Sequence, residues 1–227
     1  MGWSDSDDAV AAELASLART GMYRRSIALA GFMGVGKTSL GQLLAELLDR
    51  QFYDTDGYVE ETTQRTVDSF FPDEELEFRR REAGAVEVLL TRDPSVIALG
   101  GGALLNEHSR RLLRERSLLV HLHVPWRDLS AHIPSLIATR PLLRGKNIDE
   151  IHRLYLIRLS TYREAALRIT IGHREAAEAA ADVLRALRSL EGIRLIPGDA
   201  AASRTEIVLR ALARARSRNS LDLEQTV

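Results

Sequence analysis

A glycine-rich segment gives the clearest chemical signal in the sequence. The residues Gly31–Thr38 fit the pattern G-x-x-x-x-G-K-[ST] at every position. Glycines in such a loop let successive backbone N–H groups face one anion, and the positive end of a following helix adds a favourable field. Lys37 would then contact the β- and γ-phosphates of a nucleoside triphosphate, and Thr38 would offer a hydroxyl oxygen to Mg²⁺. We expect phosphate binding here by Gly34, Val35, Gly36, Lys37, Thr38 and Ser39.

Two acidic residues, Asp54 and Asp56, form the second chemical signal. Together with Gly57 they fit the D-x-x-G pattern of GTPases, but an N-K-x-D guanine motif is absent from the chain. Read instead as D-x-D at the end of a strand, they offer Asp54 to the magnesium ion and Asp56 to a substrate hydroxyl, whose proton a carboxylate can accept. A solvated turn at the strand end stays open as the plainer alternative.

These residues need a scaffold in which strands and helices alternate. A short apolar strand at 27–30 precedes the glycine loop, and a helix follows from Lys37. Further strands are expected near 51–55, 96–99, 118–124 and 167–171. Helices are expected at 73–90, after Asn106, at 126–137, at 149–166 and at 175–190, with an arginine-rich loop at 138–147. Because helices connect the strands, the sequence predicts an α/β domain with a largely parallel sheet.

Composition limits the possible classes of protein. The chain has 227 residues, which suits one domain at 23–191, an N-terminal helical extension at 1–22 and a basic, partly disordered extension at 192–227. With no cysteine, disulfides and thiolate metal sites are excluded. The net charge of -1 gives no global attraction to nucleic acid, and no apolar run in the sequence reaches spanning length. We expect no export, because residues 1–8 do not have the basic-then-apolar order of a secretory signal. We expect a cytoplasmic monomer without nucleic-acid or membrane partners.

Six motifs in order resemble the shikimate kinase family, a branch of the nucleoside monophosphate kinase-like P-loop proteins. The resemblance covers about residues 26–190. The motifs are Gly31–Thr38, Asp54–Asp56, Phe78-Arg79 with Glu82, Gly100–Gly102, Arg140–Leu143 and Arg158–Tyr162.

The resemblance implies a three-layer α/β/α P-loop fold with a five-stranded parallel sheet, in the order 2-3-1-4-5, and a mobile lid near Arg140. It implies transfer of a phosphoryl group from ATP to the 3-hydroxyl of shikimate, with Mg²⁺ held by Thr38 and Asp54. Lys37, Asp56 and Arg140 would be the catalytic residues. Arg140 would also contact the nucleotide and swing in with the lid.

The resemblance also implies how the acceptor is held. Arg79 and Arg158 would grip the carboxylate of shikimate, and Asp56 would hold and activate the 3-hydroxyl. The backbone of Gly101 and Gly102 would approach the ring, since glycine has no side chain to intrude. A solvated helix face for Arg79 and a plain turn for the glycines stay open as the structural alternatives.

The chain departs from the family pattern at several positions. Ile133 stands where relatives commonly have a basic residue that packs on adenine, and Arg174 is a possible contributor to that pocket or a solvent-facing residue. Ser160 replaces the proline of R-x-P-x-Y, and Glu74 replaces a frequent glycine. A kinase for a related cyclitol or sugar acid, or a non-catalytic ligand sensor, therefore remains an alternative.

Two other groups of residues lie outside this pattern. His121 and His123 face one side of a strand, which is compatible with a metal pair, although strand residues with local hydrogen bonds are the preferred interpretation. Five arginines between 204 and 218 form a basic run, which we interpret as a solvated or packing helix because aromatic residues for base stacking are missing.

Overall fold

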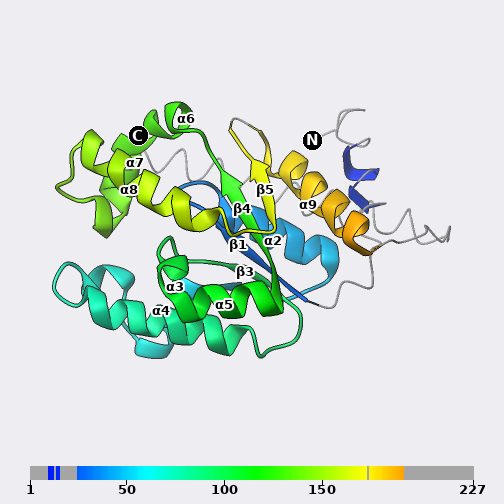
Figure 1. The fold of residues 1–227 in the computed structure, drawn as a ribbon, viewed down its shortest axis with the longest axis horizontal. Coiled ribbons are helices and arrows are strands. Elements are labelled where there is room, and N and C mark those ends of the chain that lie inside the picture. The colour runs from blue at the N-terminus through cyan, green and yellow to red at the C-terminus, as the bar shows by residue number, and fades with distance from the viewer. Residues whose placement is uncertain (1–9, 13, 16–24, 173, 192–227) are drawn as a thin grey trace, which may run out of the picture.

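The structure is a computed structural model that describes residues 10–12, 14–15, 25–172 and 174–191 (Figure 1). The strands are β1 (Ser26–Ala30), β2 (Phe52–Asp54), β3 (Val96–Ala98), β4 (Ser117–His123) and β5 (Leu167–Thr170). The helices are α2 (Lys37–Leu48), α3 (Thr55–Thr63), α4 (Glu75–Leu89), α5 (Glu107–Arg116), α6 (Trp126–Ser130), α7 (Ile133–Thr139), α8 (Ile148–Tyr162) and α9 (Ala176–Glu191). Three short 3₁₀ helices are η1 (Val67–Phe70), η2 (Ala103–Leu105) and η3 (Pro141–Leu143).

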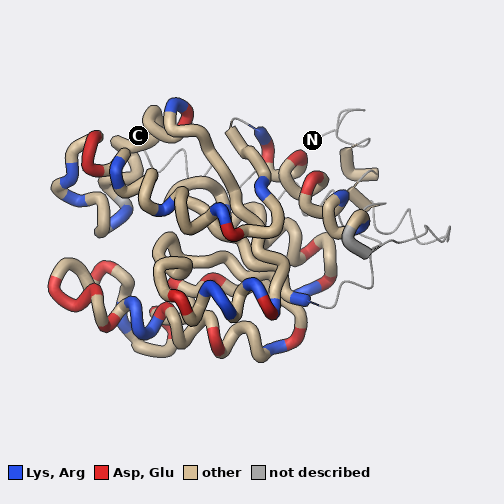
Figure 2. Tube along the Cα trace, in the orientation of Figure 1, with Lys and Arg blue, Asp and Glu red and all other residues tan. Residues whose placement is uncertain are grey.

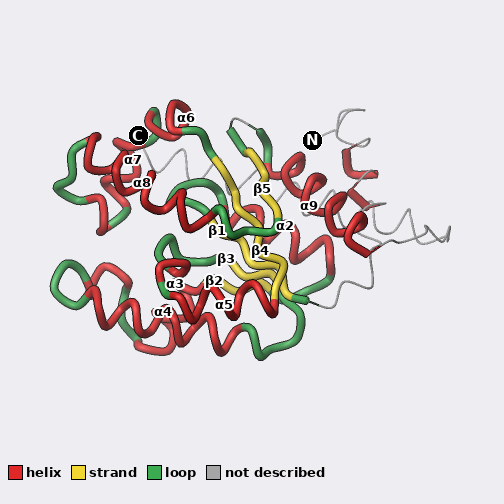
Figure 3. The backbone as a smooth tube through the Cα atoms, viewed as in Figure 1, coloured by secondary structure: helices red, strands yellow, loops and turns green. Residues whose placement is uncertain are grey.

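The strands form one parallel sheet in the order β2-β3-β1-β4-β5, which confirms the predicted order. In the register, Leu29 of β1 lies beside Ala98 of β3 and Val120 of β4. Every residue of β1 is buried, as expected for a central strand that is covered on both faces. Figure 3 shows the strands gathered between the two groups of helices.

The alternation of side chains along β1 divides the core between the two faces of the sheet. Ile27 and Leu29 belong to the cluster that contains the buried residues of α2 and α9, whereas Ala28 and Ala30 belong to the cluster with α4 and α5. Figure 1 accordingly shows α4 and α5 on one side of the sheet and α2 and α9 on the other. The three-layer α/β/α prediction is therefore confirmed.

Two details differ from the sequence prediction. The helix expected at 126–137 is two helices, α6 and α7, and Pro134 lies in the first turn of α7, where a missing N–H costs no helical hydrogen bond. The helix expected at 149–166 begins at Ile148, because Asn147 and Glu150 form a capping box, and it ends at Tyr162.

Of the predicted N-terminal extension at 1–22, the structure describes residues 10–12 and 14–15, which are helical. Ala11 and Leu14 are fully buried in the same cluster as α2 and α9, so this segment contributes to the main core. The predicted extension at 192–227, with its five arginines, lies outside the described residues.

Parallel strands place the candidate residues at one edge of the sheet. The carboxyl end of β1 leads into the glycine loop, that of β2 into Asp54–Asp56, and that of β3 toward Gly100–Gly102. Ligands of open α/β sheets bind at this edge. Arg140 and Arg158 come from the region between β4 and β5.

Candidate active site

The glycine loop is shaped to receive an anion at the N-terminus of α2. Gly34 and Gly36 have φ of 79° and 84°, in the left-handed region that favours glycine. A Cβ on Gly34 would lie 2.4 Å from Cδ2 of Leu136, whereas a Cβ on Gly36 would meet no atom within 4 Å. Gly36 gives α2 no side-chain cap, so the first N–H groups of this helix are free to bind phosphate oxygens.

The loop borders a polar cavity that contains most of the predicted phosphate-binding residues. Its lining is Met33, Gly34, Gly36, Lys37, Thr38, Ser39, Asp54, Asp56, Leu99, Gly101 and Arg140. Of the predicted set, Val35 is absent from this lining, because its side chain is 5% exposed and packs in the core. Val35 can therefore contribute through its backbone.

Lys37 is held close to its own loop. Its Nζ donates hydrogen bonds to the carbonyl oxygens of Gly31 at 2.9 Å and Phe32 at 3.0 Å. Burial lowers the pKa of Lys37 to about 8, with Asp56 opposing this shift. The ammonium group thus stands at the cavity in a position to contact phosphate.

Asp54 connects the phosphate loop to α3. Its Oδ2 accepts a hydrogen bond of 3.1 Å from Oγ1 of Thr38. Its Oδ1 caps α3 by accepting from the N–H groups of Asp56 at 3.0 Å and Gly57 at 3.4 Å. The D-x-x-G spacing therefore reflects the cap of α3. The hydrogen bond between Thr38 and Asp54 places two hard oxygen donors, suited to Mg²⁺, side by side.

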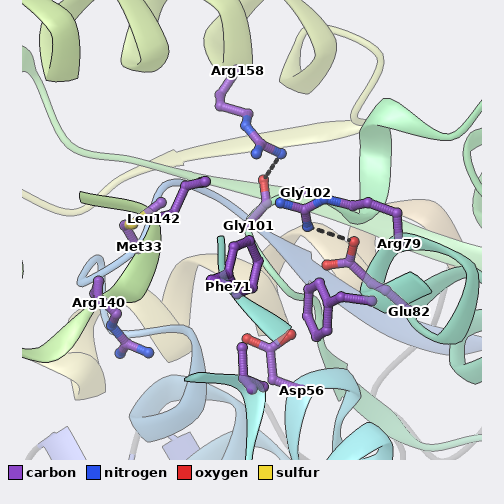
Figure 4. Close-up of a pocket in the computed structure, with 12 residues that line it drawn as sticks. Met33, Asp56, Phe71, Arg79, Glu82, Gly101, Gly102, Arg140, Leu142 and Arg158 are labelled. Atoms are coloured by element: carbon purple, nitrogen blue, oxygen red, sulfur yellow. Dashed lines mark hydrogen bonds and ion pairs between the residues drawn. The ribbon is translucent and has the colours of Figure 1, made fainter. Parts of the chain in front are cut away.

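Asp56 lines both the polar cavity and a second cavity. Figure 4 shows the residues that line the second cavity. Oδ1 of Asp56 is buried without a hydrogen-bond partner among the described residues. Burial, followed by the charges of Glu82 and Asp54, raises the pKa of Asp56 to about 7. A carboxylate with this basicity and a vacant acceptor position can take a proton from a hydroxyl group.

Two arginines from different helices meet at Gly102 in the second cavity. Arg79 of α4 and Arg158 of α8 approach it from different sides in Figure 4. A Cβ on Gly102 would lie 2.1 Å from Nη1 of Arg79 and 2.8 Å from Nη1 of Arg158. The predicted pair thus converges, although it lies far apart in the sequence, and the side chain of Arg158 is buried.

Acidic partners hold Arg79 in this position. Its Nη1 contacts Oε2 of the buried Glu82 at 2.8 Å, and its Nη2 contacts Oε1 of Glu75 at 3.0 Å. The backbone of Gly100 passes between the side chains of Asp56 and Glu82. Its N–H donates a hydrogen bond to Oγ1 of Thr55 at 2.7 Å, and a Cβ on Gly100 would lie 2.2 Å from Oε1 of Glu82. The solvated-face interpretation of Arg79 does not describe this arrangement, since its side chain is 20% exposed.

The rest of the second cavity is apolar. Met33, Val67, Phe71, Phe78 and Leu142 contribute its remaining wall. Sequence reasoning did not assign these residues to the site. Three of them, Met33, Phe78 and Leu142, lie inside motifs of the family resemblance, which was the available signal. Val67 and Phe71 lie in and after a 3₁₀ helix that has no diagnostic spacing.

The predicted lid residue Arg140 is exposed and lines both cavities. Farther along the same segment, Nη2 of Arg144 pairs with Oδ2 of Asp68 in η1 at 2.5 Å. This pair joins the segment after α7 to η1, where Val67 and the following Phe71 line the second cavity. Figure 2 shows basic residues along the segment between α7 and α8 and acidic residues between α3 and α4.

Ile133 and Arg174 are the two positions that the sequence relates to a nucleobase pocket. Ile133 is 2% exposed and packs in the core, so its side chain is not available to a base in this arrangement. Arg174 contacts Asp182 at 2.7 Å and Glu178 at 3.5 Å. These ion pairs with α9 agree with the interpretation of Arg174 as a solvent-facing residue.

The two histidines of β4 lie together, with ring centroids 5.5 Å apart. Burial lowers the pKa of both, to about 4 for His121. Within the described residues, no group of three or more His, Cys, Asp or Glu side chains could hold a metal ion. The histidines are therefore described as neutral strand residues, with His121 packed on Tyr162.

Among the residues that the structure describes, no helix is long and apolar enough to cross a bilayer.

Comparisons with known proteins agree on one family. A family model described as shikimate kinase matches residues 33–188. A shikimate kinase of Geobacillus kaustophilus is 32% identical over 170 residues, which are 74% of this chain and 90% of that protein. A shikimate kinase of Psychrobacter cryohalolentis is 38% identical over 143 residues, which are 62% of this chain and 76% of that protein.

Solved structures give the same result. The shikimate kinase from Acinetobacter baumannii in complex with shikimate matches with a TM-score of 0.70 and 32% identity, over 77% of this chain and 98% of that one. The shikimate kinase from Aquifex aeolicus matches with a TM-score of 0.63 and 28% identity, over 74% and 96% of the two chains.

Proposed function

The chain belongs to the shikimate kinase family, and from this premise we propose that it transfers the γ-phosphoryl group of ATP to the 3-hydroxyl of shikimate. The observation that carries the proposal is the position of Asp56, which lines both the polar cavity of the glycine loop and the cavity where Arg79 and Arg158 converge. A phosphate site and a carboxylate site thus share one buried base.

Shikimate carries a carboxylate on a ring with three hydroxyl groups, and the second cavity offers matching groups. The guanidinium groups of Arg79 and Arg158 can donate to the carboxylate in the forked geometry that arginine favours. The apolar wall with Phe71 and Phe78 can cover the ring, and Gly101 and Gly102 leave room for it. Asp56 would then accept from the 3-hydroxyl.

In the proposed reaction, the 3-hydroxyl oxygen attacks the γ-phosphorus, its proton passes to a carboxylate oxygen of Asp56, and the bond to the leaving oxygen of ADP breaks. Lys37 and Arg140 would stabilise the negative charge on the transferring group. The raised pKa of Asp56, about 7, suits proton transfer near neutral pH. The segment around Arg140 would close as a lid and exclude water.

Thr38 and Asp54 would hold Mg²⁺, since both offer oxygen atoms at the phosphate cavity and their side chains are 3.1 Å apart. Bound there with ATP, the ion would neutralise phosphate charge. Asp54 keeps its second oxygen on the α3 cap, which fixes its orientation. We also propose a cytoplasmic location, which fits a cysteine-free chain that consumes ATP.

A coupled assay of ADP release tests the proposal. The purified chain, ATP and Mg²⁺ are incubated with shikimate or with related cyclitols and sugar acids in parallel. We expect shikimate-dependent turnover that collapses in Lys37→Ala and Asp56→Asn while circular dichroism stays unchanged. A preference for another acceptor would refute shikimate as the substrate, and shikimate binding without turnover would favour a sensor.

A further inference from the structure

Tyr162 shares a hydrogen-bond acceptor with the arginine proposed to bind the substrate carboxylate. Its hydroxyl donates to the carbonyl oxygen of Gly101 at 3.1 Å, and Nη1 of Arg158 donates to the same oxygen at 2.6 Å. The two residues lie one turn apart on α8, so they project from the same face of the helix. Both lone pairs of this carbonyl are therefore occupied.

The two donors differ in what else they can do. Arg158 lines the second cavity, and its Nε has no hydrogen-bond partner among the described residues. Its guanidinium can turn toward an acceptor carboxylate and give up the carbonyl of Gly101. Tyr162 has a single hydroxyl proton and does not line the cavity, so its bond to Gly101 can persist when Arg158 changes partner.

The surroundings of Tyr162 fix this bond. The residue is 3% exposed, and its ring packs on the ring of His121 with centroids 4.9 Å apart. Burial raises the pKa of the Tyr162 hydroxyl, so it remains a protonated donor in the neutral range. A Cβ on Gly101 would meet nothing closer than Cε of Met33, at 3.9 Å. The neighbouring Gly100 and Gly102 are held by hydrogen bonds to Thr55 and Leu105, whereas the carbonyl of Gly101 is held by Arg158 and Tyr162.

We propose that Tyr162 is a positioning residue for the acceptor: it holds the backbone of Gly101 and Gly102 in place while Arg158 engages the carboxylate of the substrate. The inference rests on the proposed function and adds a residue to it. It predicts that losing the hydroxyl of Tyr162 affects binding of the acceptor and leaves binding of ATP unchanged.

The chain provides a matched control. Tyr155 lies on the same helix, is 6% exposed, and donates from its hydroxyl to the carbonyl oxygen of Val124 at 3.1 Å. Tyr155 is absent from the linings of both cavities. Tyr155→Phe and Tyr162→Phe thus remove the same kind of bond, with the same length and similar burial, and both retain the ring.

The experiment measures KM for shikimate, KM for ATP, kcat and melting temperature in the full chain and both variants. We expect similar decreases in melting temperature, because each variant loses one buried hydrogen bond. Tyr162→Phe should raise KM for shikimate about five- to tenfold and leave KM for ATP within about twofold. Tyr155→Phe should leave both KM values within about twofold.

Two results would overturn the inference: equal KM values for shikimate in the two variants, or a rise of both KM values in Tyr162→Phe. If the unchanged chain does not phosphorylate shikimate, the proposed function itself fails, and this result is distinct from a failure of the inference alone.

Discussion

Gly102→Ala tests the convergence of the two arginines directly. The added methyl carbon would lie 2.1 Å from Nη1 of Arg79 and 2.8 Å from Nη1 of Arg158, whereas ordinary contacts are about 3.5 Å or longer. Gly102 has φ of -104°, so alanine is compatible with the backbone and the effect is confined to these contacts. At least the guanidinium of Arg79 must therefore move by more than about 1 Å.

Such a movement has a calculable effect on acceptor binding. Nη1 of Arg79 also contacts Oε2 of Glu82 at 2.8 Å, so the displacement disturbs an ion pair whose carboxylate is buried. Loss of one charge-assisted hydrogen bond to the substrate costs about 1.5–3 kcal/mol, which corresponds to about a ten- to hundredfold rise in KM for shikimate. KM for ATP should stay within about twofold, because Gly102 does not line the polar cavity.

Gly84→Ala is the matched control, because it makes the same chemical change in α4, the helix that carries Arg79 and Glu82. A Cβ on Gly84 meets no atom within 4 Å, so alanine should raise stability by about 0.5–1 kcal/mol without changing either KM. Both variants are compared by coupled ADP release and thermal unfolding. An unchanged KM for shikimate in Gly102→Ala, or an equal rise for both substrates, would refute the assigned role of the arginines.

Three further predictions concern the metal, the lid segment and the strand histidines. Thr38→Ala should raise the Mg²⁺ concentration for half-maximal rate at least about tenfold while shikimate still protects the chain from thermal unfolding; an unchanged requirement would remove Thr38 from the metal site. Arg144→Ala should raise KM for shikimate at most about fivefold at low salt and less at high salt, since an exposed ion pair with Asp68 contributes about 0.2–1 kcal/mol, and Asp68→Ala in the same chain should add nothing further. The unfolded chain protonates His121 near pH 6.5 and the folded chain near pH 4, so the contribution of His121 to stability should fall by up to about 1.4 kcal/mol per unit as pH drops through this window. Asp56, whose pKa is raised to about 7, contributes with the opposite sign, so the comparison with a variant isolates the effect of His121. Urea titrations of His121→Phe should show a smaller loss, and an identical slope would contradict the assigned burial effect.

Local patterns in the sequence were sufficient to predict the alternating strands and helices and a largely parallel sheet, while the sheet order was implied by the family resemblance. Buried strands such as β1 are short apolar runs, and the glycine motif at Gly31–Thr38 has one well-defined geometry between a strand and a helix. The residues expected to bind phosphate and magnesium came from such local patterns. Their placement around the polar cavity follows from a parallel sheet, whose strands all end at the same edge.

Other features depended on packing between distant segments. Periodicity alone could not bring Arg79 and Arg158 together beside Gly102, and their pairing was expected from the family resemblance. The apolar wall residues Val67 and Phe71 lack a helical or strand period, so their contribution was not predicted. The split of the helix at 126–137 depended on whether Pro134 begins a helix or interrupts one, which sequence alone leaves open.

The hydrogen bonds of Asp54 connect the phosphate loop to the helix that carries Asp56. One oxygen contacts Thr38 in the phosphate loop, and the other caps the turn of α3 that carries Asp56. A metal ion bound at Asp54 would thus restrict the same turn that presents the base to the acceptor. If Mg²⁺ with nucleotide changes the equilibrium affinity for shikimate by some factor, shikimate must change the affinity for Mg²⁺ with nucleotide by the same factor. This thermodynamic reciprocity holds whichever ligand binds first.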